Sequence, residues 1–582
     1  MATSVQNRLH PSLANAVSRC RRAFLLVGIF SGLINVLALT GAIYMLQLYD
    51  RVIPSHSTPT LIALTIIMVV LYAGYGLLDY ARTRMMTGIG MRIERTLRDD
   101  IHAAVLLLPL RSRTAGDGLL PVRDLDQIRS FLSGPGPTAL FDLPWLPFYL
   151  ALVFMLHPWL GAVGTAGAVV LLALTMLTEI RSRKLASDAV KSGTERQATA
   201  AGQHRNAETI RALGMTGRVN LLWARLSEAH LADQARASEM VALYGTISKV
   251  IRFVLQSAVL GLGAWLVIQG QATGGIMIAA SIMISRALAP VEIAIANWRG
   301  FVSARQSAAR LSAVLHSLPQ AADVTTLPKP TAKLAVSDLW VAAPGEAKPI
   351  LQGVAFELAA GDGLGIIGVS ASGKSTLTRA LVGAWTPMRG TVRIDDATLD
   401  QWPPDELGAH VGYLAQEVEL LEGTVAQNIA RFDPEAPDEW IVGAARPAGV
   451  HEMILHLPEG YETRVSDRGT GLSAGQRQCI ALARALFGDP FLVVLDEPNS
   501  NLDADGDAAL SRAIQSVRQR RGIVVVVAHR PSALAGLDKV LVLAGGRVQA
   551  FGNKDEVLRQ ATKPPPAAAA ASGSRLTVIT DN

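Results

Sequence analysis

The chain has 582 residues, of which 50% are hydrophobic and only 18% are charged, and its mean hydropathy is +0.30. This composition is too apolar for a soluble enzyme of this size, and the length allows two or more domains. The net charge of +6 is modest, and nucleic-acid binding, which would need a clustered basic face, is not expected. Cys20 and Cys479 are the only cysteines, so no disulfide framework is implied.

The apolar residues are unevenly distributed along the chain. They form long blocks before about residue 300, whereas the remainder has the composition of an ordinary globular protein. This asymmetry predicts a membrane half followed by a soluble half. Residues 1–22 are polar, and the apolar run that follows has no small-residue cleavage site, so we expect an uncleaved anchor.

Six apolar runs are predicted to cross a bilayer as three helical hairpins. The runs are Phe24–Leu46, Leu61–Leu78, Leu143–Leu156, Trp159–Leu177, Phe253–Ile268 and Gly274–Ser285. Basic residues precede the first run and follow the second and fourth, whereas the turns within the hairpins carry few charges. By the positive-inside rule, both ends of this region are therefore cytoplasmic.

Two long polar segments, about 82–137 and 179–250, separate the hairpins. Their Ala, Glu, Arg and Gln content predicts helices that continue beyond the bilayer into the cytoplasm. One short stretch in each, 124–128 and 206–210, is expected to touch a partner domain. An ordinary solvated helix face is the alternative for both stretches.

Several charges lie close to the predicted membrane spans. Arg286 is about twelve residues from the preceding turn, which places it roughly 18 Å deep in a helix. Because a cation facing lipid is costly, we expect Arg286 to face protein or a water-filled cavity. Lys249, Arg252 and Glu292 lie at or below a comparable depth, and Pro290 predicts a kink in the sixth helix. The alternative is that these residues lie past the membrane boundary on helix extensions.

A Pro- and Thr-containing linker leads from the membrane half to the soluble half, and the tail after about residue 561 is low in complexity and predicted to be disordered. The predicted domain boundaries are 1–22 for the cytoplasmic N-terminal segment, 23–315 for the transmembrane domain, 316–331 for the linker, 332–560 for the nucleotide-binding domain and 561–582 for the tail.

The segment Gly368–Thr376 fits the pattern G-x-x-x-x-G-K-[S/T] between a predicted strand, Gly363–Ile367, and a predicted helix, Leu377–Gly383. In this context backbone N–H groups and a helix N-terminus form a cradle for phosphate. We expect Lys374 to reach the β- and γ-phosphates of a nucleoside triphosphate and Ser375 to bind Mg²⁺. A glycine turn with a surface lysine is the alternative. The candidate nucleotide-binding residues here are Gly368, Ser370, Ala371, Ser372, Gly373, Lys374, Ser375 and Thr376.

Two further predicted strands end in polar residues. Phe491–Leu495 is a continuous apolar run, typical of a strand buried on both faces, and it ends in Asp496 and Glu497. Carboxylates at such a strand end lie where ligands bind in parallel sheets, so Asp496 is expected to hold Mg²⁺ and Glu497 to take a proton from an attacking water. Gly522–Val527 leads to His529, which could bond the γ-phosphate, although a lone histidine is more often structural.

A serine-containing turn, Leu472–Gln476, precedes a predicted helix, Arg477–Phe487, and is a second candidate anion site. With L-S-x-G-Q upstream of a D-E strand, the chain resembles the ATP-binding cassette family along essentially its whole length. The resemblance implies a multidomain fold: an all-α six-helix transmembrane domain of the type I ABC exporter kind and an α/β P-loop nucleotide-binding domain. It also implies a head-to-tail homodimer, in which each ATP lies between the P-loop of one subunit and Ser473, Gly475 and Gln476 of the other.

The same resemblance implies roles for individual residues. Gln416 would be the loop glutamine that joins the site to the membrane domain and, with Ser375 and Asp496, would hold the metal. Asp503 would cross the dimer interface, and His529 would be the switch histidine. The implied catalytic residues are Glu497, His529 and Gln416.

Four motifs narrow the resemblance. They are Leu46–Pro54, Leu140–Trp145, Arg286–Glu292 and Asp496–Asp503, in which D-E-P-N-S-N-L-D replaces the commoner E-A-T-S-A-L-D. They are similar to type I secretion exporters of Gram-negative bacteria, within these to the protease, lipase and S-layer protein exporters. This implies an unfolded protein substrate with a C-terminal signal, an inner-membrane homodimer with its nucleotide-binding domain in the cytoplasm, a periplasmic membrane-fusion adaptor and an outer-membrane channel. The stretches 124–128 and 206–210 would then be coupling helices.

The chain departs from the family pattern at two places. Ala343 precedes Pro344 where an aromatic residue usually stacks on adenine, and Trp340 lies nearby in the wrong register. Ala474 replaces the commoner glycine of the signature, with little effect expected.

Two other functions are weighed against protein export. One is an exporter of lipid or hydrophobic small molecules with the same architecture. The other is a membrane-anchored regulator or scaffold, against which Glu497 and His529 argue because a scaffold does not need hydrolysis.

Overall fold

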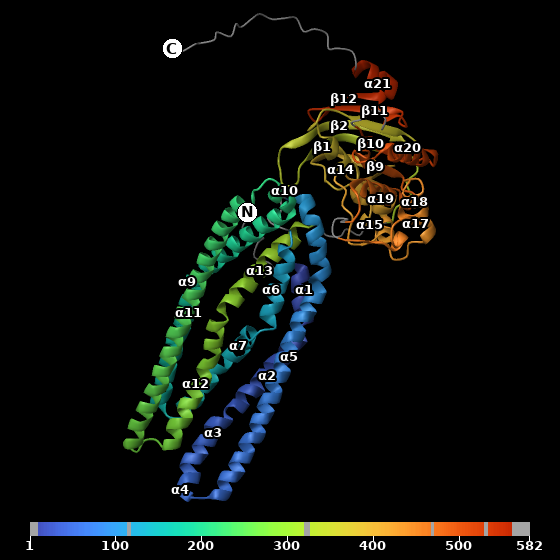
Figure 1. Ribbon diagram of the computed structural model, residues 1–582. Coiled ribbons are helices and arrows are strands. Elements are labelled where there is room, and N and C mark those ends of the chain that lie inside the picture. Colours follow the sequence, from blue (N-terminus) through green and yellow to red (C-terminus); the bar gives the residue numbers. More distant parts are fainter. Residues whose placement is uncertain (1–9, 113–117, 319–325, 467–470, 529–533, 562–582) are drawn as a thin grey trace, which may run out of the picture. The chain divides into compact units, whose positions relative to one another are not determined.

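The computed structural model describes residues 10–112, 118–318, 326–466, 471–528 and 534–561. The chain divides into two compact units (Figure 1). The first comprises Met1–Pro109 and Thr114–Pro319, and the second comprises Leu110–Arg113 and Gln320–Asn582. Part of the predicted linker and nearly all of the predicted tail lie outside the described residues.

The first unit is helical throughout its described part. Its helices are α1 (Pro11–Arg19), α2 (Arg21–Ala38), α3 (Thr40–Gln47), the π-helical turn η1 (Leu48–Val52), α4 (Ile53–Ser55), α5 (Thr58–Arg111), α6 (Leu120–Leu132), α7 (Gly136–Asp142), the 3₁₀ turn η2 (Leu143–Trp145), α8 (Leu146–Leu156), α9 (Pro158–Arg205), α10 (Ala207–Ala212), α11 (Thr216–Ile268), α12 (Gly274–Ala296) and α13 (Trp298–Ser317).

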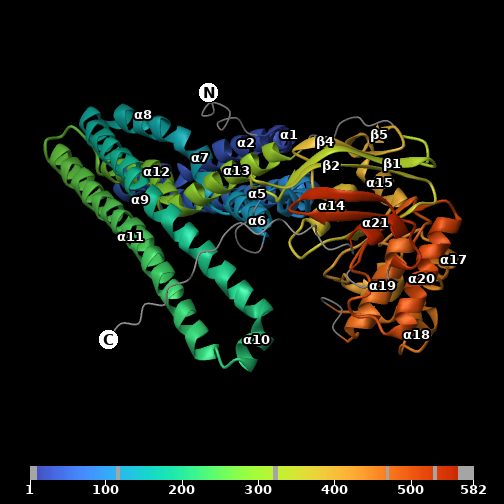
Figure 2. The same cartoon turned by 90° about the horizontal axis from the view of Figure 1, so that it is seen from above.

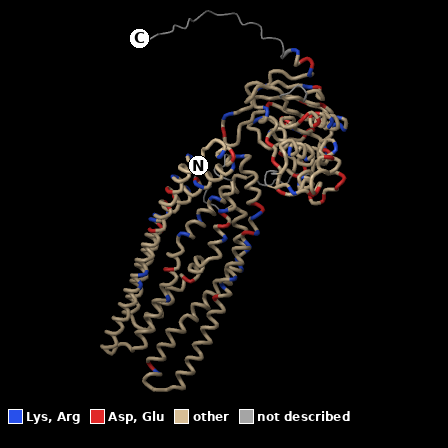
Figure 3. Tube along the Cα trace, in the orientation of Figure 1, with Lys and Arg blue, Asp and Glu red and all other residues tan. Residues whose placement is uncertain are grey.

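Six helical stretches are long and apolar enough to span a membrane, as the six apolar runs predict. Their most apolar windows have mean hydropathies between 1.7 and 2.3. Figure 3 shows that the charged residues of the long helices gather toward the end drawn at the top, and that the lower part is largely without them. The stretches are Arg21–Ser55, Thr58–Arg111, Gly136–Leu156, Pro158–Arg205, Thr216–Ile268 and Gly274–Ala296. The first crossing is not one regular helix, because α2 and α3 are interrupted at Leu39 and end in the π-helical turn.

The polar segments between hairpins continue as helices, as predicted, but in two different ways. Helices α9 and α11 run side by side to the short α10 at one end (Figures 1 and 2), and Glu208 of α10 is exposed. In contrast, Asp124 of α6 is only 4% exposed, and its carboxylate accepts hydrogen bonds from Ser307 (2.8 Å) and Arg310 (2.5 and 3.0 Å) of α13. Asp124 is therefore bound within its own unit and does not lie on a solvated helix face, whereas the contact of the stretch 124–128 with another domain stays a prediction.

A polar cluster joins four helices of the first unit. The carboxylate of Asp142, at the end of α7, accepts hydrogen bonds from Arg82 of α5 at 2.9 and 3.0 Å, from Asn35 of α2 at 2.8 Å, and from the hydroxyl of Ser31. The hydroxyl of Tyr149 on α8 donates to the Asn35 carbonyl at 2.6 Å. Because a buried charge is costly without partners, this set of bonds holds the four helices in one arrangement.

A second tie lies at the hairpin ends. Asp50, in the π-helical turn, accepts hydrogen bonds from the Thr273 hydroxyl at 2.7 Å and the Gly275 N–H at 3.0 Å. A carboxylate is favourable at a helix N-terminus, so Asp50 caps α12. Gly275 permits this approach, since a Cβ there would lie 2.6 Å from the Asp50 carboxylate.

The charges near the predicted spans differ in their surroundings. Arg252 of α11 pairs with Glu292 of α12 at 2.5 Å, whereas Arg286 has an exposed side chain. Pro290 lies inside α12, which continues to Ala296.

The second unit contains two larger sheets. Its strands are β1 (Lys333–Ala342), β2 (Pro349–Ala359), β3 (Gly363–Ile367), β4 (Arg389–Ile394), β5 (Ala397–Thr398), β6 (Val411–Leu414), β7 (Gly423–Thr424), β8 (Arg464–Val465), β9 (Leu492–Asp496), β10 (Ile523–Val527), β11 (Lys539–Ala544) and β12 (Arg547–Asn553). Its α-helices are α14 (Lys374–Leu381), α15 (Pro404–His410), α16 (Val425–Ile429), α17 (Asp438–Ala445), α18 (His451–Leu455), α19 (Ala474–Leu486), α20 (Ala504–Gln519) and α21 (Lys554–Ala561).

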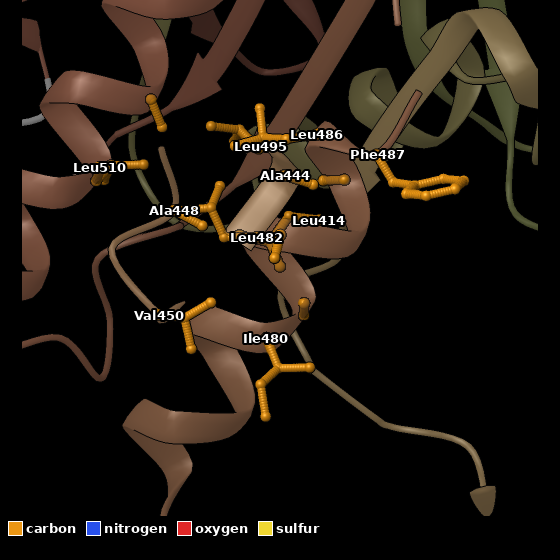
Figure 4. Packing of buried hydrophobic residues seen from close by; sticks show 14 of the residues in the cluster. Leu414, Ala444, Ala448, Val450, Ile480, Leu482, Leu486, Phe487, Leu495 and Leu510 are labelled. Carbon is orange, nitrogen blue, oxygen red and sulfur yellow. The ribbon is translucent and has the colours of Figure 1, made fainter. Parts of the chain in front are cut away.

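The larger sheet has the strand order β12-β11-β3-β10-β9-β6, and its strands are parallel except for β12. The other sheet is antiparallel, with the order β2-β1-β4-β5. Strands β9 and β10 are buried along their whole length, because both faces of the parallel sheet are covered. One face packs on the helical part of this unit through residues such as Leu414, Ile480 and Leu495 (Figure 4). Because β3, β6, β9 and β10 run parallel, their carboxyl ends lie at one edge of the sheet.

Candidate functional site

The turn after β3 has the backbone of a phosphate-binding loop. Gly373 has a φ of 101°, in the left-handed region that favours glycine, and a Cβ there would lie 2.7 Å from Leu351. At Gly368, a Cβ would lie 2.2 Å from the Leu543 carbonyl oxygen. With Gly373 as its N-cap, α14 begins at Lys374, earlier than the predicted start at Leu377. Lys374 therefore stands in the first turn of the helix, where the N-terminal dipole favours an anion.

The side chain of Lys374 is held in the loop. It is 6% exposed, and its ammonium donates to the carbonyls of Gly368 at 2.9 Å and Val369 at 3.1 Å. Ser372 is buried, and its hydroxyl has no hydrogen-bond partner among the described residues. The loop thus contains an ammonium group, on Lys374, and a hydroxyl without a hydrogen-bond partner in the described ranges, on Ser372.

Oxygen atoms from three elements meet beside the start of α14. The Ser375 hydroxyl lies 3.4 Å from Oε1 of Gln416, which follows β6. Asp496, at the end of β9, is 1% exposed; its Oδ2 accepts from Thr378 at 3.2 Å, while its Oδ1 has no partner in the described part of the chain. Burial raises the pKa of Asp496, an effect that the hydroxyls of Ser375 and Thr378 oppose.

These oxygens suit a hard divalent cation. Mg²⁺ prefers oxygen ligands and is held by one or two carboxylates together with phosphate oxygens. Ser375, Gln416 and Asp496 supply a hydroxyl, an amide and a carboxylate oxygen, and the buried Oδ1 of Asp496, which has no hydrogen-bond partner in the described ranges, suits coordination of such a cation. No group of three His, Cys, Asp or Glu side chains in the described ranges offers another metal site.

Sequence analysis missed Thr378. It lies three residues after Ser375, on the same face of α14, and its hydroxyl holds the carboxylate of Asp496. The predicted helix begins at Leu377 and does not include Ser375, so the sequence does not place the two hydroxyls on one helix face. Partners of this kind fix the orientation of a metal ligand.

Glu497 follows Asp496 in an unusual backbone conformation. Its φ is 53°, a left-handed value that costs free energy in any residue with a side chain, and its N–H donates to the Val527 carbonyl of β10 at 3.2 Å. Strain of this kind is retained where the surrounding structure holds it, often at functional sites. His529, the predicted switch histidine after β10, lies outside the described residues.

The signature turn forms a reciprocal cap. The Ser473 hydroxyl accepts from the Gln476 N–H at 3.2 Å, and Oε1 of Gln476 accepts from the Ser473 N–H at 2.8 Å. This capping box starts α19 at Ala474, before the predicted start at Arg477. Two donors of the helix end are thereby satisfied.

A cleft of about 450 Å³ lies beside this cap. It is lined by Ser473, Gly475 and Gln476 and by residues of the α20 start, including Asp503. The carboxylate of Asp503 caps α20 by accepting from the Gly506 N–H at 2.9 Å. The candidate residues thus form two groups, one around Lys374 and Asp496 and one around Ser473, and the segment 496–503 runs from the first to the second.

Comparison with known proteins identifies the family. The model of the ABC transporter family matches residues 351–500, and that of the ABC transporter transmembrane region matches residues 24–290. The type I secretion system ATP-binding protein PrsD of Rhizobium meliloti is 51% identical over 97% of this chain and 97% of its own. The chain belongs to the ABC transporters of type I secretion.

Other relatives agree with this assignment. The leukotoxin translocation ATP-binding protein LktB of Mannheimia haemolytica is 30% identical over 94% of this chain and 78% of its own length. The toxin RTX-I translocation ATP-binding protein of Actinobacillus pleuropneumoniae is 30% identical over 93% of this chain and 77% of its own length. A solved bacterial Atm1-family ABC exporter with ATP bound has the same fold, with a TM-score of 0.82 at 21% identity, over 93% of this chain and 96% of that one. The predicted fold class is confirmed, and this ABC transporter is a multi-pass membrane protein that binds nucleotide and couples ATP hydrolysis to transport.

The surroundings of Ala343, one of the two positions that depart from the family pattern, are defined by the structure. Ala343 stands where an aromatic residue usually stacks on adenine. The nearby Trp340 donates its indole N–H to Asp338 at 2.8 Å, and Asp338 pairs with Arg389 at 2.9 Å. The indole is therefore held by its own strand.

Proposed function

We propose that this ABC transporter exports an unfolded polypeptide with a C-terminal signal across the bacterial inner membrane. It would act as a homodimer with its cassettes in the cytoplasm, together with a periplasmic membrane-fusion adaptor and an outer-membrane channel. The observation that carries the proposal is the similarity to a type I secretion ATP-binding protein along 97% of the chain. Because the similarity includes the membrane half, it bears on the transported substrate as well as on ATP.

ATP binding would begin at the P-loop. The ammonium of Lys374 would leave the carbonyls of Gly368 and Val369 for the β- and γ-phosphates. A charge-assisted bond to phosphate is stronger than a bond to a neutral carbonyl, so the exchange favours the bound state. Ser370, Ala371, Ser372, Gly373 and Thr376 would complete the cradle with backbone N–H groups and hydroxyls.

Ser375, Gln416 and Asp496 would hold Mg²⁺, which when bound neutralises negative charge on the phosphates. The role of Asp496 requires its ionised form, which burial disfavours in the nucleotide-free protein. A cation bound beside Asp496 would therefore stabilise the ionised carboxylate and lower its pKa.

Glu497 would act as the general base that takes a proton from the attacking water. His529 would hydrogen-bond the γ-phosphate. The α19 N-terminus of the second copy, with its Ser473, Gly475 and Gln476, would contact the same phosphate from the other side, where the dipole of the helix favours negative charge. In this arrangement hydrolysis requires two paired cassettes.

The proposal is tested by secretion from living cells. Cells that carry this transporter with its adaptor and channel are compared with cells that carry Glu497→Gln, and extracellular proteins are identified by mass spectrometry. We expect one or more polypeptides to be found outside wild-type cells and inside the variant cells. Equal secretion by both would contradict the proposal.

A second measurement separates polypeptide export from export of hydrophobic small molecules. ATPase activity of the purified protein in nanodiscs is measured with the C-terminal segment of the secreted protein and, separately, with detergent-like amphiphiles. Stimulation by the segment alone is expected. Stimulation by amphiphiles alone would contradict the proposed substrate.

A further inference from the structure

The side chain of Gln478 joins the signature helix to the loop that carries Glu497. It lies on α19 and is 2% exposed. Its Nε2 donates to the Pro498 carbonyl and lies 3.4 Å from the Glu497 carbonyl oxygen. Its Oε1 accepts from the Asn501 N–H at 3.1 Å. One buried amide thus bonds to the loop at both ends.

Two further contacts hold this loop. At Gly475, a Cβ would lie 3.0 Å from the Asn501 carbonyl oxygen, so the first turn of α19 is close against the loop. On the other side, the Glu497 N–H is bonded to Val527 of β10 at 3.2 Å. Glu497, with its strained φ, therefore lies between β10 and α19, and both elements contact its backbone.

We infer that Gln478 is a positioning residue that sets the orientation of Glu497 and links the two ATP sites of the dimer. The inference rests on the proposed function, in which the N-terminus of α19 serves the ATP of the partner subunit while Glu497 serves the ATP of its own subunit. Gln478 is five residues after Ser473, or about 7.5 Å along a rigid helix. A displacement of α19 at the partner's phosphate is therefore transmitted through the Gln478 amide to the loop of Glu497.

The inference is tested first by removing the hydrogen bonds and keeping the volume. Gln478→Met has a similar length and cannot bond to Pro498 or Asn501. Because a catalytic group displaced by about 1 Å loses up to about a hundredfold in rate, we expect kcat to fall at least about tenfold. We expect the KM for ATP to remain near wild type and the Hill coefficient for ATP to fall toward 1.

A second variant changes one end of the amide. Gln478→Glu keeps an acceptor for the Asn501 N–H and places a carboxylate oxygen against the Pro498 carbonyl oxygen, so it should lower kcat more than Gln478→Met. Ile480→Val, at a fully buried apolar position of the same helix, is the packing control and should keep wild-type kcat and cooperativity. Fluorescent ATP-analogue binding checks that each variant is folded.

Mixed dimers with two affinity tags decide which subunit is affected. One chain carries Glu497→Gln, so the remaining turnover depends on Glu497 of the other chain. We expect Gln478→Met to lower this turnover when it is placed in the chain with the intact Glu497, and to have little effect in the other chain. The opposite pattern, or unchanged kcat and Hill coefficient in both homodimeric variants, would overturn the inference.

The test distinguishes this inference from the proposed function. If the wild-type protein hydrolyses ATP and secretes its substrate while the Gln478 variants behave as wild type, only the positioning role fails. If the wild-type protein lacks cooperative ATPase activity, the composite site of the proposed function fails as well.

Discussion

The P-loop and the signature turn both lead into a helix N-terminus, but they hold their polar groups in opposite ways. Around the P-loop, Lys374 is bonded to main-chain carbonyls, and Asp496 Oδ1 has no partner within the described ranges. In the signature turn, Ser473 and Gln476 satisfy each other. The first half is stabilised further only when a ligand arrives, whereas the second is complete without one. The difference indicates that the two halves should respond differently to substitution.

The largest effect is expected from Glu497→Gln on the P-loop side. Loss of a general base typically lowers a rate by about 10²–10⁴-fold, while the amide keeps the size of the side chain. ATPase assays should show this loss, and fluorescent ATP-analogue binding should be unchanged. Glu357→Gln, at an exposed carboxylate on β2, is the control and should retain full turnover. Normal steady-state hydrolysis in Glu497→Gln would remove the catalytic role.

Lys374→Ala should weaken ATP binding by about 10- to 100-fold, since a hydrogen bond from a charged group contributes about 1.5–3 kcal/mol. Titration with a fluorescent ATP analogue measures the change. The control is Lys329→Ala, at an exposed lysine of the same unit. An unchanged Kd would mean that Lys374 stays on its carbonyls when the nucleotide binds.

Substitution of Asp496 tests whether the buried carboxylate lowers the stability of the nucleotide-free protein. Its pKa is raised, so the folded protein binds a proton more readily than the unfolded chain, and folding stability falls as the pH rises through that raised pKa. Asp496→Asn should remove this pH dependence and stabilise the nucleotide-free protein by roughly 1 kcal/mol, the lower range for a buried unsatisfied group. Thermal unfolding at several pH values measures it.

The opposite result for Asp496→Asn, a less stable nucleotide-free protein at neutral pH, would mean that the ionised carboxylate is already satisfied. Added Mg²⁺ with ATP should stabilise the wild type more than the variant, which keeps the P-loop contacts but loses a carboxylate ligand for the cation.

The smallest effect is expected on the signature side. Ser473→Ala removes one half of the capping box and should destabilise the protein by about 1 kcal/mol. Thr424→Ala is a matched control, because Thr424 and Gln427 form the same kind of box at α16. Both variants should lower the unfolding temperature similarly, and only Ser473→Ala should also lower ATPase activity. Equal activity in the two would show that the Ser473 cap is purely structural.

Local motifs made much of this predictable. The P-loop, the strand before Asp496 and the signature turn are each contiguous, so residue type and spacing carry the prediction. The predicted helix starts, Leu377 and Arg477, lie three residues after the observed starts, Lys374 and Ala474. The N-caps Gly373 and Ser473 begin each helix before its apolar periodicity becomes visible.

Long-range partners were not predictable from the same patterns. Arg82 and Asp142 are 60 residues apart, and Asp124 and Arg310 are 186 apart, so no local spacing marks either pair. The burial of Asp124 was not predicted, because its surface-like sequence context gives no sign of the carboxylate's partner on α13. Gln478 was missed for a similar reason, since its amide bonds across to a loop 20 residues later in the chain.

The hydrogen bonds between Asp50 and the start of α12 restrict how the first and third hairpins can move relative to each other. Parting the first hairpin from the third at this end would break the hydrogen bonds from Thr273 and from the Gly275 N–H to the Asp50 carboxylate. Within one chain, a movement that keeps these bonds therefore carries Asp50 and the first turn of α12 together.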